Sequence, residues 1–122
     1  MLLLTPEALR ASYEYLRSTK PFNGWNLPAA EEVEMKVVSI SDIAGDHSTY
    51  RRQHWKKYGR HIIRISDKTV SSTDRLLRTM AHEMIHVGQE ECGTATKGEH
   101  NKDFYKRLQA VAHIHGFDSK WF

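Results

Sequence analysis

The stretch SSTDRLLRTMAHEMIHVGQEECG, residues 71–93, carries most of the information that the sequence holds about the fold. Its apolar residues recur at helical spacing and form one stripe, made of Leu76, Leu77, Met80, Ala81, Met84 and Ile85. The cluster Ser71-Ser72-Thr73-Asp74 offers side chains that cap a helix N-terminus, and Gly93 is suited to ending a helix. These signals predict one long helix from the cluster to about Cys92.

A metal-binding pattern lies inside this helix. Residues 82–86 read His-Glu-Met-Ile-His, which matches the H-E-x-x-H motif of zinc hydrolases. Residues four apart lie on the same face of a helix, so His82 and His86 can reach one ion. Glu83 is rotated by about 100° from His82 around the helix axis, which lets its carboxylate act as a general base instead of a ligand. A chance match on an ordinary amphipathic helix is the alternative, and the capped helix and the histidine that follows argue against it.

A catalytic zinc site needs a third protein ligand and an open fourth position. His100 is the candidate, because it starts a second expected helix that can fold back across residues 87–99. Glu90 and Glu99 are the rivals: Glu90 lies one turn beyond His86, and Glu99 directly precedes His100. We therefore expect one Zn²⁺ held by three histidines, with Glu83 as the catalytic residue.

The rest of the chain predicts an α+β domain. Thr5 and Pro6 are suited to the N-cap and first position of an N-terminal helix, which would stop at Lys20-Pro21. Strands are expected at 33–40, near 48–54 and at 60–66, with a turn at 42–48 around Gly45-Asp46. A last helix should run from about Asn101 to His115. The order is a helix, a small and mostly antiparallel sheet, the H-E-x-x-H helix and a C-terminal helix carrying the third ligand.

The composition is that of a soluble globular protein. The chain has 122 residues, of which 39% are hydrophobic and 27% charged, with a mean hydropathy of −0.62. These values exclude a disordered chain and a membrane-spanning one, and the length predicts a single domain over residues 1–122. The formal net charge of +3 permits an anionic partner without requiring one.

The cysteine count and the N-terminus indicate where the protein works. With a single cysteine the chain can form no intramolecular disulfide and no cysteine-rich zinc site, and it fits a reducing compartment. The apolar run at residues 1–4 is too short for a signal peptide. We expect a cytoplasmic, non-secreted protein with no membrane partner, located in the host-cell cytoplasm if a phage encodes it.

These motifs resemble those of the SprT-like (Spartan-type) zinc metallopeptidases. The likeness spans about residues 33–116 and rests on Ile63-Arg64-Ile65-Ser66, on the segment from Met80 to His86 and on His100-x-x-x-Phe104. It implies a minimal zincin-like domain in which His82, His86 and His100 bind zinc and Glu83 is the catalytic acid and base. It also implies a link to DNA, since family members with known roles cleave proteins crosslinked to DNA.

The chain departs from many family members in two ways. They carry a cysteine-type zinc ribbon after the core, which we do not expect here, since the core is followed by no further cysteine. The segment after the third histidine reads Asn101-Lys102-Asp103 and lacks the usual Gly-Pro.

A basic run at 51–61 leaves the partner open. Its cations and interleaved aromatic could contact a single-stranded nucleic acid, through Arg51, Arg52, Trp55, Lys56 and Lys57. The alternative is a solvated hairpin. We expect His47 and His61 to be ordinary surface or strand residues.

Three functions are compatible with these patterns. The first is a zinc metalloendopeptidase acting on protein or peptide substrates, with DNA as a further partner. The others are a nucleic-acid-binding module with a structural zinc, and a zinc amidase with a non-protein substrate such as a cell-wall amide. The sequence does not specify the oligomeric state.

Overall fold

The computed structural model describes residues 2–49, 61–96, 98, 100–120 and 122. Within these residues the domain is α+β, as the sequence predicts. The helices are α1 (Pro6–Arg17), α3 (Thr73–Cys92) and α4 (Lys102–His115), and two short 3₁₀ turns, η1 (Phe22–Gly24) and η2 (Ala30–Glu32), connect α1 to the sheet. The strands are β1 (Val33–Val38), β2 (Gly45–Thr49) and β3 (His61–Ser66). None of the described helices has the length and apolarity that a membrane crossing requires.

Local signals in the sequence set the ends of the helices. The side chain of Thr5 accepts a hydrogen bond from the N–H of Ala8 at the start of α1, at 3.1 Å. Ser72 caps α3 and Asn101 caps α4 in the same way. Both α3 and α4 end at a glycine with positive φ, where other residues would be strained. These boundaries confirm the predicted helices, except that α1 ends at Arg17, before the predicted stop at Lys20-Pro21.

The sheet differs from the prediction in its topology. Its order is β1-β3-β2, with β3 parallel to β1 and antiparallel to β2. The sheet is therefore mixed and not mostly antiparallel, because β1 and β2, consecutive along the chain, do not pair and β3 enters between them. This pairing depends on contacts between distant parts of the chain, which a strand-by-strand pattern does not contain.

The predicted turn around Gly45-Asp46 is wrong, because both residues belong to β2. A Cβ atom on Gly45 would lie 2.7 Å from the carbonyl oxygen of Arg64, so glycine is needed there for close approach to β3. The strand predicted near 48–54 overlaps β2 only at Ser48 and Thr49. Its remaining residues lie outside the described part of the chain.

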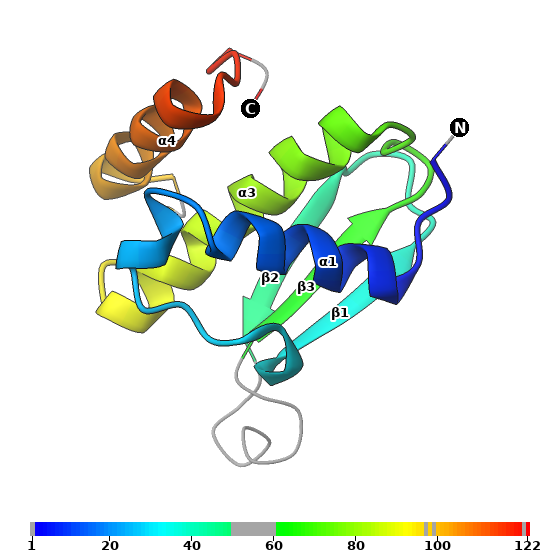
Figure 1. The fold of residues 1–122 in the computed structure, drawn as a ribbon, viewed down its shortest axis with the longest axis horizontal. Helices are drawn as coiled ribbons and strands as arrows, with labels where there is room; N and C mark the ends of the chain where they lie inside the picture. Colours follow the sequence, from blue (N-terminus) through cyan, green and yellow to red (C-terminus); the bar gives the residue numbers. More distant parts are fainter. Residues whose placement is uncertain (1, 50–60, 97, 99, 121) are drawn as a thin grey trace.

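The core lies between the sheet and the two helices α1 and α3, which run side by side against it (Figure 1). Ile63 and Ile65 of β3 are fully buried and point to this side, as do Met80 and Met84 of α3. Each such side chain contributes about 1.5–3 kcal/mol through burial, so α3 is held firmly along its apolar stripe. α4 packs against α3 (Figure 1). The polar face of α3 is thereby positioned between β2 and the start of α4.

Candidate metal centre

The structure brings the three predicted histidine ligands together. His82 and His86 come from successive turns of α3, and His100 directly precedes the N-cap of α4. One ring nitrogen from each lies within 4.8 Å of the other two. Within the described part of the chain this is the only group of three or more potential metal ligands that converges in this way. These three histidines are positioned to hold a metal ion.

Of the two rival ligands, Glu90 is described by the structure and does not join this group. Glu90 lines the same pocket, yet it is not among the residues whose ligand atoms converge. Glu99 lies outside the described residues. The arrangement of the three histidines thus follows the spacing argument: two come from one helix face, and the third comes from the segment that folds back.

Phe104 forms a shared backing for the three imidazoles. Its ring centroid lies 4.4 Å from that of His100, 4.8 Å from His86 and 5.1 Å from His82. The side chain belongs to the first turn of α4 and is only 1% exposed. Because its ring lies against all three imidazoles, it limits their rotation. In the sequence, Phe104 stands out only as the end of the segment His100-x-x-x-Phe104.

The electrostatics favour a neutral imidazole at His82. Burial, reinforced by the neighbouring His86 and His100, lowers the pKa of His82 to about 4, although a hydrogen bond to the backbone of Phe122 raises it in part. His82 is therefore neutral at physiological pH. The neutral ring is the form that binds a metal, so the site needs to release no proton from His82 when an ion enters.

Glu83 lies beside the histidines in a concave site. Its side chain is 5% exposed and lines a pocket of about 370 Å³ together with His82, His86 and His100. Strand β2 forms the opposite wall through residues 45–49. The carboxylate is thus placed next to the candidate ligands without being one of them.

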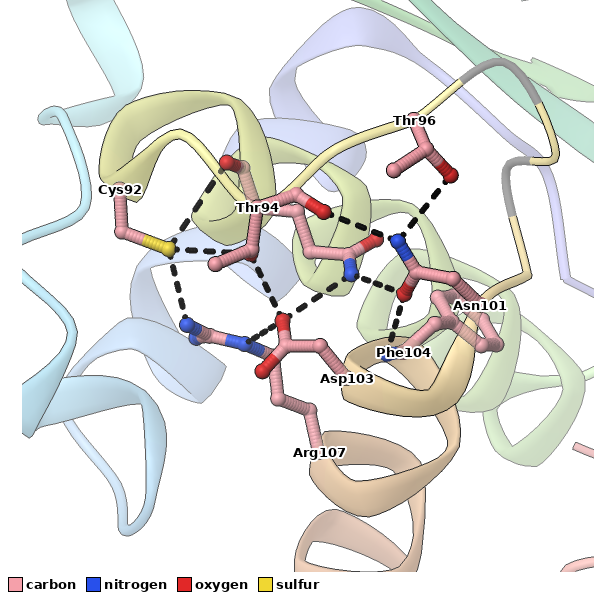
Figure 2. Close-up of polar contacts among 8 residues, drawn as sticks. Cys92, Thr94, Thr96, Asn101, Asp103, Phe104 and Arg107 are labelled. Carbon is pink, nitrogen blue, oxygen red and sulfur yellow. Dashed lines mark hydrogen bonds and ion pairs between the residues drawn. The ribbon is translucent and has the colours of Figure 1, made fainter.

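A cluster of polar side chains fixes the segment that carries His100 (Figure 2). Its centre is Gln89, which is fully buried on α3. The Nε2 of Gln89 donates to Asn101 Oδ1 at 2.9 Å and to Asp103 Oδ2 at 3.0 Å. Asn101 in turn donates through Nδ2 to the carbonyl of Thr94 at 2.9 Å. We call this set, with Arg107, the Gln89 cluster.

Asp103 is the anionic member of the Gln89 cluster. It accepts hydrogen bonds from Thr94 Oγ1 at 2.7 Å and Arg107 Nε at 2.8 Å, in addition to the one from Gln89 (Figure 2). Burial raises the pKa of Asp103, but these hydrogen bonds outweigh it and lower the pKa to about 2. The cluster ties the end of α3 to the start of α4 on either side of His100. No signal in the sequence marked Gln89 or Asp103 for this role.

Two further histidines, His47 and His61, reach the site from the sheet. Both are strand residues, as expected, but His61 is only 1% exposed. Its Nδ1 lies 2.9 Å from His47 Nε2, and its Nε2 lies 3.3 Å from Glu91 Oε1. His47 lines the pocket with its ring stacked near that of His86, at 6.2 Å between centroids. Burial, followed by the neighbouring His61 and His86, lowers the pKa of His47 to about 3.

The residues proposed for nucleic-acid contact lie outside the described part of the chain. They are Arg51, Arg52, Trp55, Lys56 and Lys57.

The fold and the site define a class: an α+β domain whose central helix and following segment present three convergent histidines and a neighbouring glutamate. Residues 18–120 match the model of the SprT-like family, and the chain belongs to this family. This confirms the resemblance drawn from the motifs. Searches of curated proteins and of solved structures found no match.

Proposed function

We propose that this protein is a zinc-dependent metalloendopeptidase that hydrolyses peptide bonds of protein substrates. The observation that carries the proposal is the convergence of His82, His86 and His100 next to Glu83 in one pocket. Membership of the SprT-like family supports it, since that family is associated with zinc metallopeptidases.

The donor set fits zinc. Three imidazole nitrogens with an open side toward the pocket correspond to the ligand number and type of catalytic zinc sites. Hard cations such as Mg²⁺ and Ca²⁺ prefer oxygen ligands and fit this set poorly. A bound zinc ion would supply a Lewis acid that lowers the pKa of water and polarises the scissile carbonyl.

Glu83 would move the proton in this reaction. Its carboxylate lies beside the ligands, where it can accept the proton of the attacking water and deliver it to the leaving amine. Phe104 would keep the imidazoles in place during the reaction, because it backs all three rings. The Gln89 cluster would hold His100 at the site.

The test is the variant Glu83→Gln, which keeps the shape of the side chain and removes its basicity. We expect about one zinc per chain by elemental mass spectrometry in both proteins, and a fall in peptide cleavage of roughly 10²–10⁴-fold. Glu90→Gln is the matched control, because Glu90 lines the same pocket and has no role in the proposed chemistry. If Glu83→Gln cleaves peptides at the wild-type rate, the proposed role of Glu83 is refuted.

The metal ligands need a separate test. His100→Ala should lose most of the bound zinc, since only two of the three candidate ligands, both on α3, would remain. Unchanged zinc content in this variant would remove His100 from the ligand set. A cell-wall amide offered in the same hydrolysis assay separates a peptidase from an amidase.

A further inference from the structure

A chain of hydrogen bonds leads from the surface to the pocket wall, and the proposed chemistry makes no use of it. It runs from Glu91 on α3 through the buried His61 on β3 to His47 on β2. His47 and His61 are diagonal neighbours on the helix-facing side of the sheet, because His47 pairs with Ile63 and His61 with Thr49. The backbone register therefore fixes this contact.

The positions of the protons in this series of hydrogen bonds follow from the carboxylate of Glu91, at which it begins. A carboxylate only accepts, so the Nε2 of His61 carries a hydrogen toward Glu91. A neutral His61 that donates from Nε2 has its Nδ1 left as an acceptor. His47 must then donate from Nε2 to His61, at 2.9 Å. A neutral His47 consequently has a bare Nδ1.

This bare nitrogen is available to a ligand. The Nδ1 of His47 makes no hydrogen bond with any described residue, and it is not sealed from solvent. His47 lines the same pocket as Glu83 and the three candidate metal ligands. It is not itself one of the converging ligands. The pocket wall thus offers a hydrogen-bond acceptor of fixed orientation close to the proposed reaction centre.

We propose that His47 binds substrate by accepting a hydrogen bond from a backbone N–H near the scissile bond, and that His61 and Glu91 are positioning residues that hold its tautomer. The inference rests on the proposed peptidase function. A polypeptide substrate supplies such donors at every residue, whereas the side chains of a substrate do not supply them reliably. His47 would then help to place the substrate without taking part in the proton transfer by Glu83.

The kinetic test is a double-mutant cycle with substrates in which one amide is replaced by an ester, which lacks the N–H. The replacement is made in turn at the bonds on either side of the scissile bond. In the wild type, one ester should lower kcat/KM by about two- to tenfold, the effect of one hydrogen bond. In His47→Phe, which keeps a ring for packing, that penalty should vanish while the zinc content stays the same.

Thr49→Val is the matched control, because Thr49 lines the same pocket from the same strand. It should keep the ester penalty. An equal penalty in the wild type and in His47→Phe, or none at any position in the wild type, would overturn the inference and leave the peptidase function intact. Failure of the wild type to cleave any peptide would overturn the proposed function and this inference together.

A measurement on the wild type does not depend on the variant folding. Nitrogen-15 NMR of the imidazole rings should show His47 protonated at Nε2 and bare at Nδ1, and His61 the same. In Glu91→Ala the ring of His47 should become a mixture of tautomers, an effect that loss of packing alone does not predict. A hydrogen on Nδ1 of His47 in the wild type would overturn the inference.

Discussion

Replacing Gln89 with leucine should weaken binding of zinc at the proposed site without unfolding the domain. The variant loses two hydrogen bonds, to Asn101 at 2.9 Å and to Asp103 at 3.0 Å. Neither partner is left unsatisfied: Asn101 Oδ1 still accepts from the N–H of Phe104, and Asp103 keeps its bonds from Thr94 and Arg107.

The magnitude follows from opposing contributions. Two hydrogen bonds, one of them to a charged group, contribute about 2–4 kcal/mol together. Leucine has nearly the same volume as glutamine, so it fits the site. It also removes Gln89 Oε1, a buried acceptor with no partner among the described residues. Removing this unpaired acceptor gains about 1–2 kcal/mol of stability, which offsets part of the loss. The net loss is about 1–2 kcal/mol. If this whole loss becomes a cost of ordering the segment that carries His100, the affinity for zinc drops by about five- to thirtyfold.

The assay is a zinc titration against a competing chelator, together with urea unfolding of the metal-free protein. Glu14→Ala is the control, since it removes the carboxylate that accepts a hydrogen bond from the N–H of Ala30 at 2.7 Å, on α1 and away from the histidines. It should lower stability and leave zinc affinity unchanged. If Gln89→Leu lowers stability and binds zinc as tightly as the wild type, the Gln89 cluster does not order His100.

Three further predictions concern stability. The pKa of Asp103, about 2, lies below its unfolded value, so its contribution is complete above about pH 4 and is lost as the pH falls toward 2. Between pH 5 and pH 2 the free energy of unfolding in urea should therefore fall less in Asp103→Asn than in the wild type. The difference should be roughly 1 kcal/mol once screening at this partly exposed site is allowed for. Identical pH profiles of the two proteins would contradict the prediction. Phe104→Ala should lower the free energy of unfolding by about 3–5 kcal/mol, because the ring is fully packed, and a loss under about 1 kcal/mol would show that the ring is not needed. Gly45→Ala should destabilise by about 1–3 kcal/mol in thermal unfolding, since its Cβ would lie 2.7 Å from the carbonyl of Arg64. Gly24→Ala is the control, because a Cβ there meets nothing within 4 Å; equal effects of the two would argue against steric crowding at Gly45.

The helices and the pairing of His82 and His86 on one face of α3 could be predicted because their signals are local. An N-cap side chain, a C-terminal glycine and two histidines four apart act within one or two turns, so their meaning does not depend on the rest of the fold. The placement of His100 needed only one additional assumption, that the next helix folds back.

The sheet order and the buried polar residues could not be predicted in this way. Gly45 and Asp46 are typical turn residues, and only the approach of β3 explains a glycine inside a strand. Gln89 is of a type that is mostly exposed, and histidine, as at position 61, is of a type that is intermediate. Their burial depends on partners far along the chain, such as Asp103 and His47, which no pattern around either residue reveals.

The origin of the three histidines in two different elements has a consequence for the architecture. Two come from α3 and one from the start of α4, so a bound ion would act as a removable cross-link between the helices. Zinc at a hundred times its dissociation constant would add about 2.7 kcal/mol to the stability of the folded state. A chelator would then both stop the proposed hydrolysis and release α4 from one of its attachments. The resistance to proteolysis of the segment between α3 and α4 would therefore follow the free zinc concentration.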